Sequence, residues 1–293
     1  MRAPEISFYD WQQQFSNDAA CLEHLATLRW PEGFQCPRCG HDHGWRLPSR
    51  PLYECARCHR QTSVTAGTLF HATKLPLTKW FWAIYWIASD KGSVSALRLA
   101  KLIGVTWRTA FSMLRKLRQA MGHRDTLYRL TEVIELDDAL LGGKRPGKRG
   151  RGAEGKACVL IACETWNGKP GFIALEHVPS VNQPTVEDFA KRRLKPGQEI
   201  HSDGLAALGS LRKNHRHIAK ITPPEEASHW LPWVHIVISN LKRFILGTYH
   251  GISHQYLQEY LDEFAYRFNR RFWEPELPNR LLRLCAEHVP VVL

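Results

Sequence analysis

Hydrophobic and polar positions change their spacing along the chain, and each spacing predicts a different kind of element. Apolar residues set about one helical turn apart predict an amphipathic helical region over residues 8–30. Residues 79–88 are apolar almost all round, which predicts a buried helix, and Thr78 just before them is a suitable N-cap. Two further helical patterns follow at 93–103 and 106–119.

The pattern of β-strands begins farther along the chain. The stretch 132–141 predicts a buried strand, in which Asp137 and Asp138 are neighbouring acids and which is followed by two glycines. Alternation along a strand points these two acids to opposite faces. Two more apolar runs, 157–165 and 170–178, flank an Asn-Gly pair, which is a strong hairpin signal. Together the three strands predict an antiparallel meander.

A second acid stands at the end of a second strand. A helix is predicted over 185–194 and a fourth strand over 198–203, which ends in Asp203 and is followed by a glycine. Burying a carboxylate is costly unless something pairs with it, and divalent cations take carboxylate oxygens. Asp137 and Asp203 could therefore share a divalent ion. The plainer interpretation of each is a solvated turn after an ordinary strand.

The helix predicted over 234–247 carries a candidate third ligand. His235 and Lys242 are seven residues apart, and steps of about 100° return them to nearly the same face. A metal ligand and a phosphate-binding lysine would then point into one cleft. A lone histidine on such a helix is more often simply packed, and Asn240, well round the helix, is the competing polar candidate. A last core helix is predicted over 253–271.

Four of the eight cysteines form two close pairs with the spacing of a zinc ribbon. Cys36 and Cys39 enclose two residues, Cys55 and Cys58 enclose two more, and fifteen residues stand between the pairs. Four thiolates supply the tetrahedral coordination that zinc prefers. A ribbon this small has little core, so the metal would supply its folding free energy. The arginines around the pairs suit phosphate contacts or form a solvated basic face.

Residues 93–120 are typical of a helix-turn-helix. Gly104 would end the first helix and Thr106 would cap the second. Apolar residues of the second helix would face the first, which leaves its polar residues for solvent or DNA. These candidate DNA contacts are Arg108, Thr109, Ser112, Arg115, Lys116 and Arg118. The alternative is an ordinary helical hairpin.

The charge balance favours a polyanionic partner. The 293 residues carry a formal net charge of +12 with a pI of about 9.5, which favours nucleic acid first and an anionic membrane surface second. A flexible basic loop after the strand at 132–141 would bind DNA phosphates, unless it is a solvated linker. Its basic residues are Lys144, Arg145, Lys148, Arg149 and Arg151.

Membrane and secreted proteins fit the sequence poorly. No run of about 18 uninterrupted apolar residues exists, so we expect no membrane span. The first ten residues lack the apolar core of a signal peptide. The paired cysteines then favour a metal site in a reducing cytosol over disulfide bonds.

The ordered set of motifs resembles insertion-sequence transposases that have a zinc ribbon, a helix-turn-helix and a ribonuclease H-like catalytic domain of the DDE type, ISXO-like. The motifs that carry the resemblance are the two Cys pairs, Ser63-Val-Thr-Ala-Gly-Thr-Leu-Phe70, the aromatic block 80–86, Glu135-Leu-Asp-Asp138, Gly142-Gly-Lys144, His201-Ser-Asp-Gly204, Asn240-Leu-Lys-Arg243, Gly247-Thr-Tyr-His-Gly251 and Tyr266-Arg-Phe-Asn-Arg-Arg271. Singly most of these motifs are common, and together they are specific.

The resemblance implies a multidomain α+β protein. Its expected parts are an N-terminal helical segment (1–31), a zinc ribbon (32–66), a helical helix-turn-helix region (67–124), a mixed α/β ribonuclease H-like catalytic domain (130–275) and a C-terminal tail (276–293). The implied function is that of a DNA transposase, which binds terminal inverted repeats and catalyses two-metal strand cleavage and strand transfer. The implied partner is double-stranded DNA, bound by a homodimer or higher oligomer in the nucleoid of a bacterial cytoplasm.

The resemblance also implies the residues of the site. Asp137 and Asp203 take the places of the family's two aspartates, which bind divalent ions, Mg²⁺ or Mn²⁺. The family's third ligand is usually Glu or Asn on a late helix, with a basic residue seven positions farther on. In this sequence His235 takes the ligand's position and Lys242 that of the basic residue. The third ligand is therefore open between His235 and Asn240.

Two other functions fit parts of the pattern. A non-catalytic DNA-binding regulator would keep the zinc ribbon and the helix-turn-helix beside a degenerate second half, and the missing glutamate at position 235 leaves this alternative open. A metal-dependent nuclease would cut DNA without joining it. A divalent-dependent nick on supercoiled DNA separates an enzyme from a regulator, and joined products separate a transposase from a nuclease.

Overall fold

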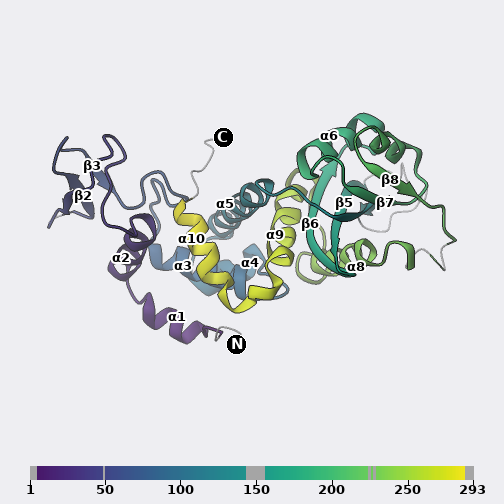
Figure 1. Ribbon diagram of the computed structural model, residues 1–293. Coiled ribbons are helices and arrows are strands. Elements are labelled where there is room, and N and C mark those ends of the chain that lie inside the picture. The colour runs from purple at the N-terminus through teal and green to yellow at the C-terminus, as the bar shows by residue number, and fades with distance from the viewer. Residues whose placement is uncertain (1–4, 49, 143–155, 224–225, 227–228, 288–293) are drawn as a thin grey trace. The chain divides into compact units, whose positions relative to one another are not determined.

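The computed structural model describes residues 5–48, 50–142, 156–223, 226 and 229–287. The chain forms two compact units, one of Met1–Ala120 together with Phe272–Leu293 and one of Met121–Arg271 (Figure 1). The second unit is thus an insertion in the chain of the first. The two ends of the chain belong to one unit.

Helices form most of the first unit. The region predicted as helical over 8–30 contains two helices, because Asn17 starts a new one: its side-chain oxygen accepts the Ala20 N–H at 3.0 Å. The helices lying wholly or mostly in this unit are α1 Phe8–Gln14, α2 Asp18–Arg29, α3 Leu77–Ser89, α4 Ala96–Ile103, α5 Trp107–Thr126, the 3₁₀-helix η3 Arg271–Glu276 and α10 Leu277–Glu287.

The N-cap predicted for the buried helix is wrong. Helix α3 begins at Leu77, one residue before Thr78, and its N-cap residue Pro76 makes no side-chain cap. The Thr78 N–H instead donates to Oδ1 of Asp18 on α2, at 3.1 Å. An acceptor from a helix 60 residues earlier replaces the local cap, so the local sequence could not predict it.

The buried character of this helix is confirmed, and α10 shares its core. Phe81 and Ile84 of α3 are fully buried, as is Leu281 of α10. The two helices lie side by side (Figure 1), and the Leu69 N–H donates to the Cys285 carbonyl at 3.0 Å. The segment 276–293, expected to be a tail, therefore includes a core helix of the first unit.

The turn between α4 and α5 has the predicted caps. Gly104 adopts the left-handed conformation, with φ at 62°, and ends α4. The hydroxyl of Thr106 accepts the Thr109 N–H at 3.2 Å at the start of α5. Both cap predictions are confirmed.

The four paired cysteines lie in and beside a small sheet of three antiparallel strands: Cys55 ends the middle strand, and the other three lie outside the strands. Its strands are β1 Gly44–Arg46, β2 Leu52–Cys55 and β3 Gln61–Ser63, in the order β1-β2-β3. The apolar cluster beneath them centres on three buried residues, Phe34, Cys36 and Cys55. So small a core is consistent with folding that depends on a bound metal.

The second unit is a five-stranded mixed sheet with helices on both faces. Its strands are β4 Val133–Leu141, β5 Ala157–Trp166, β6 Lys169–Val178, β7 Glu199–Ser202 and β8 Arg216–Ala219. Its helices are α6 Gln183–Arg193, η1 Ala206–Lys213, α8 Pro232–Thr248, η2 His254–Tyr256 and α9 Leu257–Asn269. The strand order is β6-β5-β4-β7-β8.

The predicted meander is confirmed as β4-β5-β6, and β7 and β8 extend it in parallel. Asn167 and Gly168 form the hairpin turn with φ of 50° and 69°, which is the left-handed pair that an Asn-Gly turn supplies. Strand β8 is absent from the sequence prediction. It is four residues long, and its burial pattern does not alternate, so it gives no strand signal.

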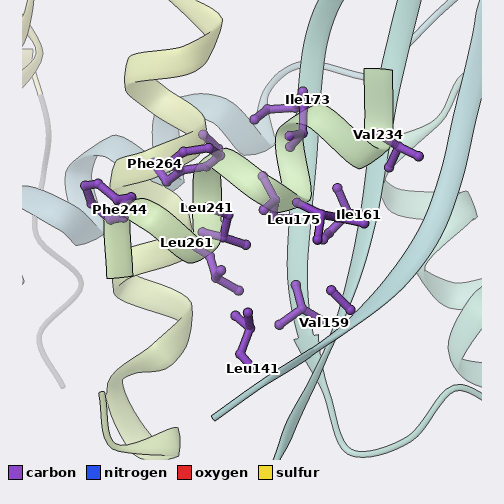
Figure 2. Close-up of a cluster of buried hydrophobic side chains, with 14 of the residues drawn as sticks. Leu141, Val159, Ile161, Ile173, Leu175, Val234, Leu241, Phe244, Leu261 and Phe264 are labelled. Carbon is purple, nitrogen blue, oxygen red and sulfur yellow. The ribbon is translucent and has the colours of Figure 1, made fainter. Parts of the chain in front are cut away.

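Alternate residues of β4 face two separate cores. Ala139 and Leu141 belong to the apolar cluster under α8 and α9, which Figure 2 shows. Ile134 and Leu136 belong to the cluster under α6 and η1 on the opposite face. Odd-numbered positions of β4 therefore face α8. The two acids Asp137 and Asp138 accordingly point to opposite faces, as predicted.

A substitution in α10 tests its place in the first unit. Replacing the buried Leu281 by alanine should cost about 2–5 kcal/mol of unfolding free energy, through lost burial and the cavity left behind. Urea unfolding followed by tryptophan fluorescence reports mainly on this unit, because every tryptophan except Trp166, Trp230 and Trp233 belongs to it. The exposed neighbour Arg283 is the control, and Arg283→Ala should change stability by less than about 0.5 kcal/mol. Equal effects of the two substitutions would contradict a core role for α10.

Candidate functional site

Two aspartates stand side by side where a parallel strand pair ends. The last pair of the β4–β7 ladder is Leu136 with Ser202, and the next residues are Asp137 and Asp203. Strand β4 itself continues to Leu141, paired with β5, so its acid lies within the strand. The sheet thus places at neighbouring positions the two acids that the sequence predicts as ion ligands.

His235 lies against the first aspartate. It belongs to the first turn of α8, and its Nε2 atom is 3.3 Å from Oδ2 of Asp137. The hydrogen bond to Asp137 raises the pKa of His235 above its usual value, although burial acts in the opposite direction. The negative charges of Asp137, Glu135 and Asp203 also raise it. The imidazole therefore occupies a position that favours positive charge.

The end of β7 is held by the segment that leads into α8. The indole N–H of Trp230 donates to the Ser202 carbonyl at 2.8 Å, and its ring stacks on His201 with the centroids 4.7 Å apart. Oδ1 of Asp203 accepts the Leu205 N–H at 3.1 Å, which fixes the carboxylate in a turn. The position of Asp203 therefore depends on contacts from the segment just before His235's helix.

Glu135 completes the acidic group, and its role was not predicted. The residue is only 4% exposed, and its Oε2 atom accepts the N–H groups of Trp233 and Val234, each at 2.8 Å. Burial raises the pKa of Glu135, and these two hydrogen bonds lower it in part. Its partners are 98 and 99 residues away along the chain. The Glu135-Leu-Asp motif marks the residue, but no local pattern could reveal what it holds.

Two carboxylates and an imidazole fit a divalent ion by their chemistry. Carboxylates suit magnesium and manganese, and imidazole is the commonest metal ligand among side chains. Within the described ranges, the four-cysteine cluster is the one group of three or more such ligands whose donor atoms all lie within 4.8 Å. Asp137, Asp203 and His235 do not form a second such group within those ranges. The three side chains would have to move closer together to bind one ion.

Lys242 and Asn240 lie farther along α8. Lys242 is exposed and lines a pocket of about 160 Å³, which also includes Leu141 and His254. Asn240 is half-buried. It follows His235 by five residues, which corresponds to a rotation of about 140° around the helix axis. Of the two candidate third ligands, His235 is the one in contact with Asp137.

The four cysteines converge as predicted. The Sγ atoms of Cys36 and Cys58 are 3.6 Å apart, those of Cys39 and Cys55 3.6 Å, and those of Cys39 and Cys58 3.5 Å. Zinc–sulfur bonds of about 2.3 Å in a tetrahedron put sulfur atoms about 3.8 Å apart. The cluster therefore has nearly the size of a Cys₄ zinc site.

The candidate DNA contacts of α5 divide by exposure. Arg108, Ser112 and Lys116 are exposed, whereas Thr109 and Arg115 are half-buried. The ammonium of Lys116 lies 5.9 Å from the centre of the Trp80 ring. Arg118 is fully buried, so its expected exposure to solvent or DNA is wrong. Arg118 lies on the apolar face of α5, between the buried residues Leu117 and Ala120 in the sequence. Because arginine is usually exposed, the sequence did not indicate that this position is buried.

The candidate contacts of the basic loop lie outside the described residues. They are Lys144, Arg145, Lys148, Arg149 and Arg151. Their predicted role in binding DNA stays a prediction.

Two family descriptions match this chain. The ISXO2-like transposase domain matches residues 129–269, and the transposase zinc-ribbon domain matches residues 16–61. The chain is also 23% identical over 275 residues to a protein of Halobacterium salinarum named an uncharacterized protein in transposable element ISH50. That match covers 86% of this chain and 91% of the relative.

Solved structures give a more distant likeness. The Mos1 strand transfer complex matches with 11% identity and a TM-score of 0.32, over 73% of this chain and 79% of that one. The Mos1 mariner paired end complex with Mn matches with 11% identity and a TM-score of 0.31, over 66% of this chain and 74% of that one.

Among the described helices, none combines the length and apolar character that a membrane span requires.

The two family matches agree with the order of parts along the chain. The zinc-ribbon match ends within β3, after all four converging cysteines, and the transposase match contains the whole five-stranded sheet with α8 and α9. Together they cover well over half of the chain. The two matches, with the relative from a transposable element, support an insertion-sequence transposase with a zinc ribbon near its N-terminus.

Proposed function

We propose that this transposase cuts the ends of an insertion sequence and joins them to target DNA at a site formed by Asp137, Asp203 and His235. The observation that carries the proposal is the contact of His235 with Asp137, at the end of the strand pair that brings Asp203 alongside. In this proposal, two acids and a histidine from three separate elements form one site. The five-stranded mixed sheet would be the ribonuclease H-like catalytic domain, within the predicted range 130–275.

The chemistry assigned to this site is phosphoryl transfer. Water attacks the phosphodiester at the element's end, and the bond from phosphorus to the 3′ oxygen breaks. The freed 3′-hydroxyl then attacks a phosphodiester of target DNA, and the target's own bond from phosphorus to its 3′ oxygen breaks, which releases a 3′-hydroxyl of the target strand. Magnesium or manganese ions, when bound, lower the pKa of water and stabilise the leaving oxygen. Asp137 and Asp203 supply their carboxylate oxygens, and His235 supplies Nε2, which must be neutral to serve as a ligand. The ammonium of Lys242 binds a DNA phosphate.

The first unit would hold the element's end. The zinc ribbon (32–66) and the helix-turn-helix region (67–124) carry the basic residues that suit the terminal inverted repeat. The two ends of an element must be cut together, so we assign the active complex at least two copies of the chain. Such an enzyme would act on the nucleoid DNA of its host's cytoplasm.

A comparison of variants tests the assignment of the site. Asp137→Ala should keep binding to the element's end and lose strand transfer, because it removes an ion ligand without touching the first unit. His235→Ala should lose joined product, by about 10²-fold or more, whereas Asn240→Ala should retain it. The measurement is joined product from a labelled element end, with magnesium or manganese present.

The outcomes separate the rival functions. Loss in Asn240→Ala alone would move the third ligand to that residue. Cleavage that survives Asp137→Ala would remove Asp137 from the site. A parent that binds the end but never cuts it with either metal would favour a non-catalytic regulator, and cutting without joining would favour a nuclease.

The proposed role of α5 has its own test. Arg108 is exposed in the first turn of α5, so Arg108→Ala should weaken binding to the element's end. If the contact is to a phosphate, the slope of log affinity against log salt should fall by about one. The exposed Arg283 of α10 gives the matched control. Equal affinity and equal slope for Arg108→Ala and the parent would refute this role.

We also propose that the four cysteines bind one zinc ion per chain. Cys39→Ser should lose most of the zinc measured by elemental analysis, and circular dichroism should report the loss of β1–β3, because three short strands have little core of their own. Cys158→Ser, at a half-buried thiol in β5, should keep the parent's zinc content. A folded ribbon in metal-free protein would contradict a structural zinc.

A further inference from the structure

The first turn of α8 takes its cap from the sheet. Leu231 at the N-cap offers no side-chain acceptor, and Pro232, the first helical residue, has no N–H to satisfy. The next two donors are the N–H groups of Trp233 and Val234, and both donate to Oε2 of Glu135 at 2.8 Å. A carboxylate is well suited to this place, because the N-terminus of a helix carries partial positive charge.

The capping residue and the candidate ligand are joined by short, stiff connections. Glu135 and Asp137 are two positions apart on β4, about 6.7 Å along one face of the strand. On α8, the Val234 N–H donates to Glu135, and the next residue, His235, contacts Asp137. Strand β4 therefore caps α8 through Glu135 and contacts His235 of the same helix through Asp137.

We propose that Glu135 is a positioning residue, which sets His235 against Asp137 by holding the first turn of α8. This inference rests on the proposed function, because Glu135 acts through His235 as the third ion ligand. This role requires a Glu135 side chain that is long enough to reach both N–H groups. Its negative charge is secondary to that reach, because an amide oxygen accepts the same hydrogen bonds.

The competing role for Glu135 is that of an ion ligand itself. Its depth argues against this role, since it is 4% exposed while the side chain of Asp137 is 14% exposed. The oxygen that holds α8 is also occupied by two backbone N–H groups. The two roles make opposite demands on the side chain, because a ligand needs charge and a positioning residue needs length.

Two conservative variants separate length from charge. Glu135→Gln keeps the length and one acceptor oxygen, and should keep the Mn²⁺ affinity and the cleavage activity close to those of the parent. Glu135→Asp keeps the charge but is one methylene shorter, so it cannot reach both N–H groups. It should weaken Mn²⁺ binding and cleavage by about 10–100-fold, as outer partners of metal ligands do. Electron paramagnetic resonance of Mn²⁺ measures the affinity independently of activity.

A double variant tests whether Glu135 acts through His235. If it does, Glu135→Asp combined with His235→Ala should bind Mn²⁺ no more weakly than His235→Ala alone. Fully additive losses would overturn the proposal, as would loss of binding in Glu135→Gln with retention in Glu135→Asp. If His235→Ala leaves Mn²⁺ affinity unchanged, the proposed function loses its third ligand. If His235→Ala weakens binding and Glu135→Asp does not, the positioning role alone fails.

Glu164 provides a matched control for disturbance of the sheet. It is also a buried glutamate, 8% exposed, and its Oε2 accepts the Thr131 N–H at 3.4 Å. It pairs with Ile134 in the β4–β5 ladder, on the face that packs against α6 and η1, away from α8. Glu164→Asp should therefore leave Mn²⁺ affinity unchanged. A thermal melt of every variant checks that the second unit stays folded.

Discussion

The parallel ladder between β4 and β7 is the constraint on which the candidate site depends. It is only four residue pairs long and stops at Leu136 and Ser202. Because β4 and β7 are parallel, the residues that follow the last pair, Asp137 and Asp203, lie at the same end of the ladder. The remaining ladders give this edge its rigidity, since β5 pairs with β4 along its full length on the other side. Helices on both faces then bury the strands and leave the acids at the place where the ladder opens.

Three acids gather at this place, and the fold gives each a different partner. Glu135 is held by two backbone N–H groups, Asp137 by the imidazole of His235, and Asp203 by one N–H of its own turn. These partners differ in how easily they can be exchanged. Releasing Glu135 would leave helix donors unsatisfied, which costs about 1–3 kcal/mol for each buried group. An ion could share His235 with Asp137, because a neutral imidazole is a ligand. The fold thus separates Glu135, which holds the first turn of α8, from Asp137 and Asp203, the two proposed ion ligands.

Much of this arrangement could be predicted from the sequence, and the rest depended on distant partners. The cysteine pairs, the Asn-Gly hairpin and the caps at Gly104 and Thr106 are local signals, and the structure confirms them. The predictions that failed concern Thr78 and Arg118, whose surroundings come from other elements. Strand β8 was missed for a related reason, because it pairs only with β7 and shows no alternation of its own. The role of Glu135 is the clearest case, since its partners lie nearly a hundred residues later.

The two metal centres proposed for this chain differ in what would assemble them. The cysteine cluster has its four thiols within 23 consecutive residues and almost no core, so the proposed zinc ion would stabilise its geometry. The acidic site draws its ligands from β4, from the turn after β7 and from α8, across about a hundred residues of sequence. The sheet that positions these residues is buried on both faces by apolar clusters. Removal of the proposed zinc ion would therefore unfold the ribbon, whereas removal of the proposed catalytic ions would abolish activity and leave the sheet folded.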